Sequence, residues 1–293
     1  MGYGLGTSTT LNDERFGTVV DALESLGWDS LWVSERISGG APDPTVAMAY
    51  AAGRTKKLKF GMSVMVLPGR NPVIVATQLA TLDRLSGGRL LPAFGLGVAN
   101  PAEQQAFGVA REDRAAWFNE ALPLLRRFWS EAEVTHHGKR FHYDALRVEP
   151  KPKQQPMDVW LGGFAPSELK RVGRLADGWL PSFILPEEAG ASKAIVEQAA
   201  ADHNREIESE HFGALIAYAM TDLPDHTVAA LRTRRPDIDP RDIIPVGLAA
   251  VRARIEQFIE HGFSKFVVLP LTEPADFEAH LAETAAELLT LHN

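Results

Sequence analysis

The stretch from residue 58 to residue 97 constrains the fold of this chain more than any other. It opens with an apolar run rich in β-formers, residues 60–67, which the turn residues PGRNP close. A helical pattern follows and stops at Gly87-Gly88, where glycine can adopt the left-handed cap conformation. A second apolar run then occupies residues 90–96. A strand, a helix and another strand in this order predict one βαβ unit with two parallel strands.

The same alternation continues along the whole chain. Apolar runs predict eight strands, each followed by a helix or by a loop and a helix, at residues 3–6, 30–33, 60–67, 90–96, 158–161, 178–183, 212–220 and 265–270. Such alternation allows an open doubly wound sheet or a closed barrel. Eight units in 293 residues fit the barrel. We therefore predict the α/β class, with a (β/α)8 TIM barrel forming a single domain over residues 1–293. Asn12 or Asp13 is the predicted cap of the first helix.

One segment departs from this alternation. Residues 133–156 carry short β-type runs around Gly138 and end in the proline-rich connector KPKQQP. We predict a small inserted hairpin there, with His136 and His137 as solvated loop side chains. Asp83, Arg84 and Arg89 flank the end of the helix in the opening stretch, and we expect them to have a structural role at the amino-terminal face of the barrel.

Composition excludes several classes of partner and site. A formal net charge of -8 argues against nucleic acid or an anionic membrane as the main partner. The chain contains no cysteine, so disulfides and thiolate catalysis are excluded. A basic segment followed by an apolar core is absent near residue 1, and no apolar run reaches 18 residues. We expect a cytoplasmic protein that acts on a small molecule.

The active site of a barrel lies at the carboxyl ends of its strands. The residues that follow the predicted strands are mostly glycines and small polar side chains, and they include few histidines. They show no catalytic triad, no paired carboxylates at one strand end and no set of metal ligands. We therefore predict no metal site. A site of this kind suits a bound cofactor that brings its own reactivity.

Two short motifs at these strand ends leave alternatives open. The run Gly162-Gly163-Phe164-Ala165 lies between a strand and the start of a helix, where free backbone amides and the helix dipole favour a phosphate. The alternative is a tight turn that binds nothing. Glu35 and Arg36 follow the second strand and form either a catalytic pair or an ion pair at the rim of the barrel.

Four ordered motifs resemble one known family. They are GMSVMVLPGRNPVIVATQLATLDRLSGGRLLPAFGLG, EQQAFGVAREDRAAWFNEALPLLRRFW, LGGFAPSELKRVGRLADGWLPS and VRARIEQFIEHGFSKFVVLP. They resemble the hallmark segments of bacterial luciferase-like flavin-dependent oxidoreductases. Within that family the chain is similar to the actinobacterial oxidoreductases that use the deazaflavin coenzyme F420.

The resemblance implies a (β/α)8 barrel that often forms a homodimer and holds a flavin or deazaflavin ring at the carboxyl end of its strands. It implies a non-prolyl cis peptide between Ser63 and Val64 that supports the ring. It also implies that the cofactor phosphate rests on the turn at residues 162–165, at the backbone amides of Gly163, Phe164 and Ala165. These residues are the expected cofactor-binding set.

The chain also departs from the family pattern. Many deazaflavin-dependent dehydrogenases carry an Asp-His pair after the second strand, where this chain has Glu35 and Arg36. A carboxylate proton donor of some relatives aligns near Asn100, with Glu103 close by. We expect Glu35, Arg36 and Asn100 to be the catalytic candidates.

The predicted function is an oxidoreductase that uses coenzyme F420 for hydride transfer to or from a small organic substrate. One alternative is an FMN-dependent luciferase-like monooxygenase that uses dioxygen. An alternative of another class is a non-catalytic flavin-binding protein.

Overall fold

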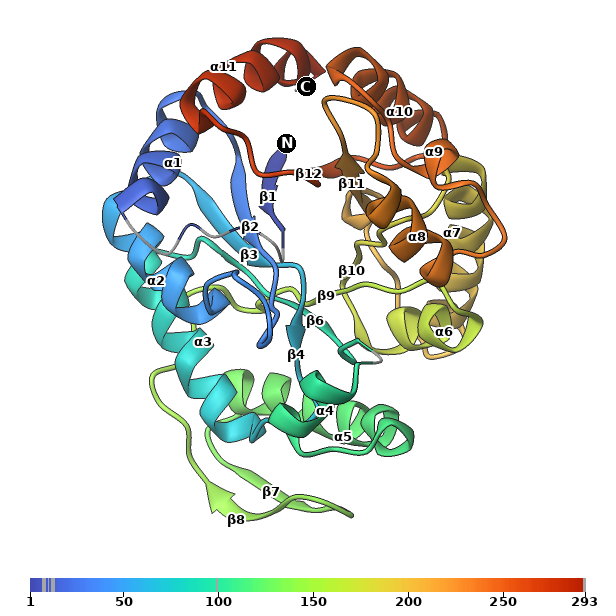
Figure 1. Ribbon diagram of the computed structural model, residues 1–293. Coiled ribbons are helices and arrows are strands. Elements are labelled where there is room, and N and C mark those ends of the chain that lie inside the picture. Colours follow the sequence, from blue (N-terminus) through green and yellow to red (C-terminus); the bar gives the residue numbers. More distant parts are fainter. Residues whose placement is uncertain (7–8, 10, 12–13, 99, 292–293) are drawn as a thin grey trace.

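The computed structural model describes residues 1–6, 9, 11, 14–98 and 100–291, so the predicted cap at Asn12 or Asp13 lies outside the described residues. Its strands form a ring that helices surround (Figure 1). One sheet has the order β11-β12-β1-β2-β3-β5 and the other the order β10-β9-β6-β4. The barrel strands are β1 (Gly2–Leu5), β2 (Ser30–Val33), β3 (Lys59–Met62), β4 (Met65–Val66), β5 (Leu90–Leu91), β6 (Ala93–Gly95), β9 (Trp160–Leu161), β10 (Gly178–Trp179), β11 (Gly213–Tyr218) and β12 (Lys265–Pro270).

The two sheets join into a closed barrel. Along one junction β3 pairs with β5 and β4 pairs with β6, all parallel. Along the other junction, parallel bridges connect Trp179 to Phe212 and Ser182 to Leu215. The predicted (β/α)8 barrel is therefore confirmed in the part of the chain that the structure describes.

The third and fourth strand positions are each interrupted, whereas the sequence predicted continuous strands at 60–67 and 90–96. A non-prolyl cis peptide between Ser63 and Val64 separates β3 from β4. Pro92 separates β5 from β6, and proline lacks the amide hydrogen that a continuous ladder requires. Each interrupted strand therefore pairs in one sheet with its first part and in the other with its second part. The cis peptide predicted at Ser63-Val64 is confirmed.

The long helices cover the outside of the barrel, because each buries one apolar stripe against the strands (Figure 1). They are α1 (Glu14–Ser25), α2 (Pro44–Arg54), α3 (Pro72–Ser86), α5 (Arg114–Ser130), α6 (Pro166–Leu175), α7 (Pro186–Ala201), α10 (Leu248–Glu260) and α11 (Phe277–Leu288). Shorter segments lie in the loops: α4 (Pro101–Phe107), α8 (Asp225–Arg234), α9 (Pro240–Ile243) and the 3-10 turns 111–113, 209–211 and 289–291.

Helix α3 begins and ends as its sequence predicts. The Asn71 side chain accepts a hydrogen bond from Val73 N at the first turn. Pro72 follows at the first helical position, where a missing amide hydrogen costs nothing. Gly87 ends the helix in the left-handed conformation with φ 78°.

The inserted hairpin consists of β7 (Val134–His137) and β8 (His142–Leu146), which pair antiparallel. Figure 1 shows it projecting beyond α5, away from the ring of strands. His136 lies 3.2 Å from Glu120, and His137 lies 2.6 Å from Asp144. The hairpin predicted within residues 133–156 is confirmed. The prediction of solvated loop histidines is wrong for His136, which lies in β7 with its side chain only 24% exposed, whereas the side chain of His137 is 63% exposed.

Two side chains of the opening stretch hold the amino-terminal face together. The buried carboxylate of Asp83 accepts hydrogen bonds from Lys153 N and Gln154 N, which fastens the connector of the insertion to α3. The Arg89 guanidinium donates to backbone carbonyls that include Leu58 O and Ala52 O. Their predicted structural role is confirmed.

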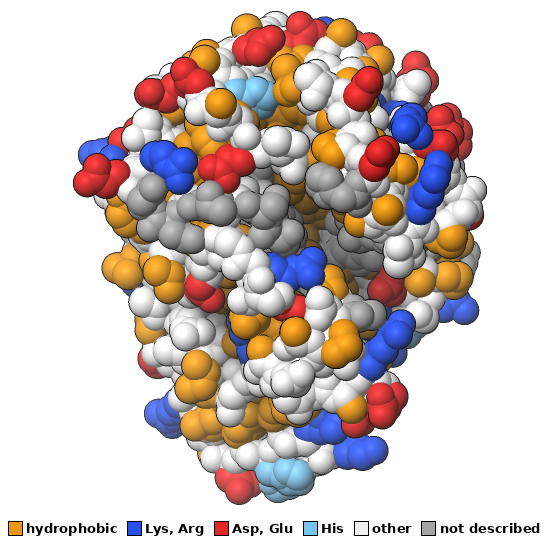
Figure 2. Space-filling view, viewed as in Figure 1, with side chains coloured by type: hydrophobic (Ala, Val, Ile, Leu, Met, Phe, Trp, Pro, Cys, Tyr) orange, Lys and Arg blue, Asp and Glu red, His pale blue; other side chains and the backbone are white. Residues whose placement is uncertain are grey.

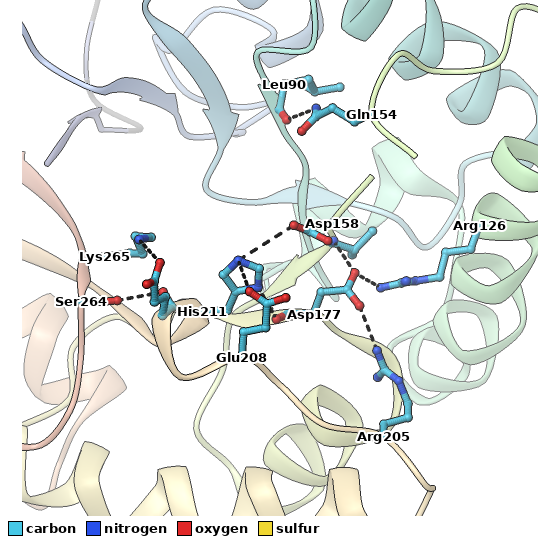
Figure 3. A network of polar contacts seen from close by, with 12 residues as sticks. Leu90, Arg126, Gln154, Asp158, Asp177, Arg205, Glu208, His211, Ser264 and Lys265 are labelled. Carbon is cyan, nitrogen blue, oxygen red and sulfur yellow. Dashed lines mark hydrogen bonds and ion pairs between the residues drawn. The ribbon is translucent and has the colours of Figure 1, made fainter. Parts of the chain in front are cut away.

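A second group of charges closes the same face below β9 and β10 (Figure 3). Asp177 pairs with Arg126 at 2.5 Å and with Arg205 at 2.9 Å. Burial raises the pKa of the nearby Asp158, and the negative charge of Asp177 adds to the shift. This group lies at the opposite end of the barrel from the carboxyl ends of the strands, and we assign it to stability.

Two tryptophans fill the barrel interior, opposite glycines of the adjoining strands. A Cβ atom at Gly61 would lie 2.4 Å from the Trp32 ring, and one at Gly178 would lie 2.5 Å from the Trp160 ring. Both tryptophans are buried with Ala93, Leu180 and Val267. The interior is therefore closed to ligands at this level.

Candidate active site

A cavity of about 480 Å³ opens at the carboxyl ends of the strands. Figure 2 shows the hollow in the middle of this face. Its walls come from the segments after seven of the eight strand positions, and side chains of α5 and α6 complete them. The predicted site residues among them are Glu35, Arg36, Ser63, Val64, Gly162, Gly163 and Phe164, and they are joined by Glu103, Arg114, Glu168, Arg171 and Phe183.

The break in the third strand lines the cavity. Val64 packs on the next strand so closely that a Cβ atom at Gly95 would lie 2.4 Å from its Cγ2 atom. The Ser63 hydroxyl is buried and has no hydrogen-bond partner among the described residues. Ser63 and Val64 therefore provide an apolar shelf with one polar group that a ligand could satisfy.

The turn after β9 already holds a carboxylate. Phe164 N and Ala165 N both donate to Glu168 Oε2 at 3.1 Å, as in a capping box at the start of α6. Gly163 has φ 90°, and its carbonyl accepts a hydrogen bond of 2.8 Å from Trp179. Two of the three backbone amides predicted to bind a phosphate, Phe164 N and Ala165 N, therefore already bind an anionic group, the carboxylate of Glu168.

Glu35 and Arg36 do not pair with each other. The side chain of Glu35 is 2% exposed and forms a two-pronged ion pair with Arg70. Val66 N also donates to it, at 2.7 Å. The carboxylate thus binds both the backbone of β4 and the turn that follows this strand. In this arrangement Glu35 positions the segment next to Val64 through its contacts with Arg70 and Val66 N.

Asn100 and Glu103 lie near the position that aligns with the proton donor of some relatives, and both side chains accept hydrogen bonds from the chain. The Asn100 side chain caps α4 by accepting a hydrogen bond from Ala102 N, and Asn100 is not among the residues that line the cavity. Glu103 lines the cavity and accepts hydrogen bonds from Ser38 and from Ile37 N. Burial raises the pKa of Glu103, but these bonds together outweigh burial and hold it below its ordinary value. Glu103 is therefore ionised near neutral pH.

Three arginines reach the cavity, and they differ in their partners. Arg114 donates to the carbonyls of Gly97 and Val98, so it braces the loop after β6. Arg171 donates to Asn119, and its pKa is lowered by burial. Arg36 is attracted by the charge of Glu103, but no carboxylate of the described residues lies within ion-pair distance of it. Arg36 is thus the arginine most available to a ligand.

Sequence reasoning missed two residues of this site. Arg70 lies in a turn, and nothing in its local pattern indicates that it pairs with Glu35 across the barrel wall. Glu168 had a partial signal: it lies three residues after the helix cap, as the Glu of a capping box does, although the cap residue Ala165 has no side-chain acceptor.

The described residues contain no group of three or more His, Cys, Asp or Glu side chains that could hold a metal ion. Among these residues no helix combines the length and the apolar character needed to span a bilayer.

Comparison with known proteins assigns the family. Residues 5–257 match the model of the family described as luciferase-like monooxygenase. The chain belongs to this family. Among its relatives is an F420-dependent glucose-6-phosphate dehydrogenase of Kineococcus radiotolerans, 30% identical over 167 residues. The match covers 54% of this chain and 49% of that one, so the chain spans about half the length of this curated relative.

Two solved structures confirm the fold. The monooxygenase RslO1 from Streptomyces bottropensis superposes with a TM-score of 0.82 at 21% identity, over the full length of both chains. An F420-dependent secondary alcohol dehydrogenase superposes with a TM-score of 0.81 at 21% identity, covering 100% of this chain and 98% of that one. At these identities the likeness extends to the fold alone.

Proposed function

We propose that this protein is an oxidoreductase that uses coenzyme F420 for hydride transfer to or from a small organic substrate. One observation carries the proposal: among the described residues that line the cavity, every carboxylate is engaged by hydrogen bonds from the chain. These are the carboxylates of Glu35, Glu103 and Glu168. None of the described side chains that line the cavity is redox-active, so redox chemistry there would come from a bound group. The relative from K. radiotolerans supports F420 as that group.

The described residues fit such a cofactor. Ser63 and Val64 offer an apolar contact for an aromatic ring. The unsatisfied buried hydroxyl of Ser63 could bond to a polar group at the edge of that ring. The carboxylate of Glu168 stands in for a phosphate at Phe164 N and Ala165 N. Gly162 and Gly163 add no side chain to this turn, and a Cβ atom at Gly163 would lie 2.6 Å from Glu168 Oε2. When bound, the deazaflavin supplies a ring carbon that takes up or releases a hydride.

The chain's own residues would then orient the reactants and exclude water. Arg36 would place a positive charge beside the ring or the substrate, where negative charge changes during hydride transfer. Glu35 would act indirectly, through Arg70 and the segment next to Val64. Asn100 would act at a distance, by holding the start of α4. These roles define the proposed catalytic set.

A fluorescence titration of the protein with F420 and, separately, with FMN tests the proposal. We expect binding of F420 at micromolar concentration or below, and weaker binding of FMN. Tight binding of FMN without binding of F420 would support an FMN-dependent monooxygenase, which the family's description favours. Binding of neither cofactor would overturn both, and binding without turnover on any substrate would support a non-catalytic flavin-binding protein.

Arg36 can be tested with the same cofactor. We expect Arg36→Ala to lower kcat/KM about tenfold or more, and Arg36→Lys to recover part of that loss because it keeps the charge. Arg232→Ala, an exposed change on α8, is the matched control. Unchanged kinetics in Arg36→Ala would remove Arg36 from the proposed set.

We also propose that the protein forms a homodimer in the cytoplasm and that residues 1–293 are one domain. The homodimer is supported by exposed apolar side chains on two neighbouring helices, Val46 and Tyr50 on α2 and Ile74 on α3. The net charge of -8 gives no support to a nucleic acid or a membrane as partner.

A further inference from the structure

Arg235 follows α8 and is the most heavily paired buried cation outside the proposed catalytic set. Its side chain is 3% exposed. The guanidinium forms ion pairs with Glu188 at 2.7 Å and with Asp237 at 2.8 Å. Both carboxylates are more exposed than the arginine, so its charge is balanced from the solvent side.

The same guanidinium contacts two loops that line the cavity. Nη1 donates to Phe183 O at 2.7 Å, after β10. The charged carbon also lies 5.1 Å from the centre of the Phe164 ring, after β9. Cation–π contacts of this kind are strongest where water is excluded. One side chain therefore connects two consecutive βα loops across the cavity wall.

Both loops need such a support. Phe183 has φ 58°, a left-handed conformation that few side chains adopt without a neighbour that stabilises it. Phe164 belongs to the turn whose amides bind Glu168. Glu188 adds a third connection, because it also accepts a hydrogen bond from Leu185 N at the start of α7.

The segment that carries Arg235 also builds part of the cavity wall. Val228 and Leu231 of α8 and Ile243 of α9 pack into a small separate core. Phe183, Leu215 and Leu271 pack against this core and also line the cavity. Ala217 of β11 belongs to the same core. The position of α8 is therefore coupled to the shape of the cavity.

We propose that Arg235 is a positioning residue for the cofactor: it fixes the loops of Phe164 and Phe183 in the arrangement that receives the ligand. It acts through these loops, and its own guanidinium is fully engaged by protein groups. The inference rests on the proposed function for its ligand and on the described contacts for its geometry.

The test uses Arg235→Gln, with Arg205→Gln as matched control. Arg205 is also paired with a carboxylate, Asp177, but at the opposite face of the barrel (Figure 3). The first readout is amide hydrogen exchange of the ligand-free protein. We expect exchange at residues 162–165 and 182–185 to rise about tenfold in Arg235→Gln and to stay unchanged in Arg205→Gln.

The second readout is the dissociation constant for F420. We expect it to rise about tenfold in Arg235→Gln, and in Arg235→Lys as well, because lysine lacks the planar fork that binds two carboxylates and a carbonyl. The dissociation constant of Arg205→Gln should stay within about twofold of the native value when each protein is measured at the same number of degrees below its own Tm.

The outcomes separate the two proposals. If the native protein binds no F420, the proposed function fails, and hydrogen exchange still decides the role of Arg235. If Arg235→Gln lowers the Tm as Arg205→Gln does but leaves exchange in both loops unchanged, Arg235 is structural and the inference is overturned. Should Arg235→Gln fail to fold, Phe164→Leu removes the cation–π contact while it keeps an apolar side chain at this position, and faster exchange confined to residues 162–165 is the expected result. Unchanged exchange there would overturn the inference too.

Discussion

Arg70 Nη2 lies 2.6 Å from Glu35 Oε1, and Nη1 of the same guanidinium lies 2.9 Å from Glu35 Oε2. This fork-to-fork pair links the loop after β2 to the turn after β4. A carboxylate at the mouth of an active site would ordinarily suggest acid–base catalysis. Here it joins two loops, because both of its oxygens are occupied.

Glu35→Gln should therefore reduce stability more than it reduces chemistry. The change leaves the Arg70 charge unpaired and weakens the bond from Val66 N, and we expect a loss of about 2–3 kcal/mol in the free energy of unfolding. Urea unfolding measures it. Glu131→Gln, which breaks an exposed pair with Arg127, is the control and should cost about 0.5 kcal/mol. A loss as small as the control's would show that the pair is not structural.

Glu168→Gln tests the turn after β9. Removing the charge should cost about 1 kcal/mol of stability through the helix cap. It should also favour a ligand phosphate, because Phe164 N and Ala165 N no longer face a carboxylate. Fluorescence titration measures the affinity for F420 divided by the affinity for the same chromophore without its phosphate. We expect this ratio to be about tenfold higher in Glu168→Gln than in the native protein. Glu187→Gln, in the first turn of α7, should leave the ratio unchanged. A falling ratio would contradict an anion site at these amides.

His280 gives the protein a pH dependence that is independent of the cavity. The imidazole contacts Tyr218 at 2.6 Å and lies near Thr284, both buried. Burial lowers its pKa below the ordinary value of 6.5, and the charge of Glu283 opposes this only in part. The unfolded chain therefore binds the proton more readily, and stability should be full above about pH 6.5 and fall as the pH drops below it.

Chemical unfolding between pH 7.5 and 5.5 measures this effect. His280→Gln keeps a hydrogen-bonding group opposite Tyr218 and removes the titration, so its stability should change less over this range than that of the native protein. Parallel curves for the two proteins would show that His280 does not contribute.

The proposed homodimer predicts an effect of Val46→Glu. Val46 is 69% exposed on α2, and a carboxylate there would have to be desolvated in an interface. We expect light scattering to report a dimer for the native protein and a monomer for Val46→Glu. Ile195→Glu introduces the same charge at an exposed apolar position on α7 and should leave the dimer intact. A native monomer would overturn the proposal.

The fold was readable from sequence because its signals are local. Apolar runs, the Asn71-Pro72 start of α3 and its Gly87 end each specify an element within a few residues. The interruptions at Ser63-Val64 and Pro92 were harder, since pairing with two different sheets is a property of the closed barrel. The cis peptide was predicted from family resemblance, and no local pattern indicated it. The single domain over residues 1–293 stays a prediction.

The sequence predicted the position of the candidate site but not the contacts within it. Strand-end positions located Ser63, Val64 and the turn at residues 162–165, because parallel strands all end at one face. The sequence did not predict which side chains form hydrogen bonds or ion pairs with each other. Glu35 pairs with a residue 35 positions away, and Arg235 reaches three segments that only the tertiary fold brings together. Which carboxylates are free for chemistry is therefore a question of structure.

The tryptophans in the barrel interior have a consequence for how this protein can diverge. Trp32 fits because position 61 is glycine, and Trp160 fits because position 178 is glycine. A larger residue at either glycine is tolerated only if the facing tryptophan shrinks in the same lineage. In each pair the sizes of the two residues should therefore covary among homologues, so that their combined volume stays constant. Loss of a tryptophan with its glycine kept would instead deepen the cavity without altering a single residue at its rim.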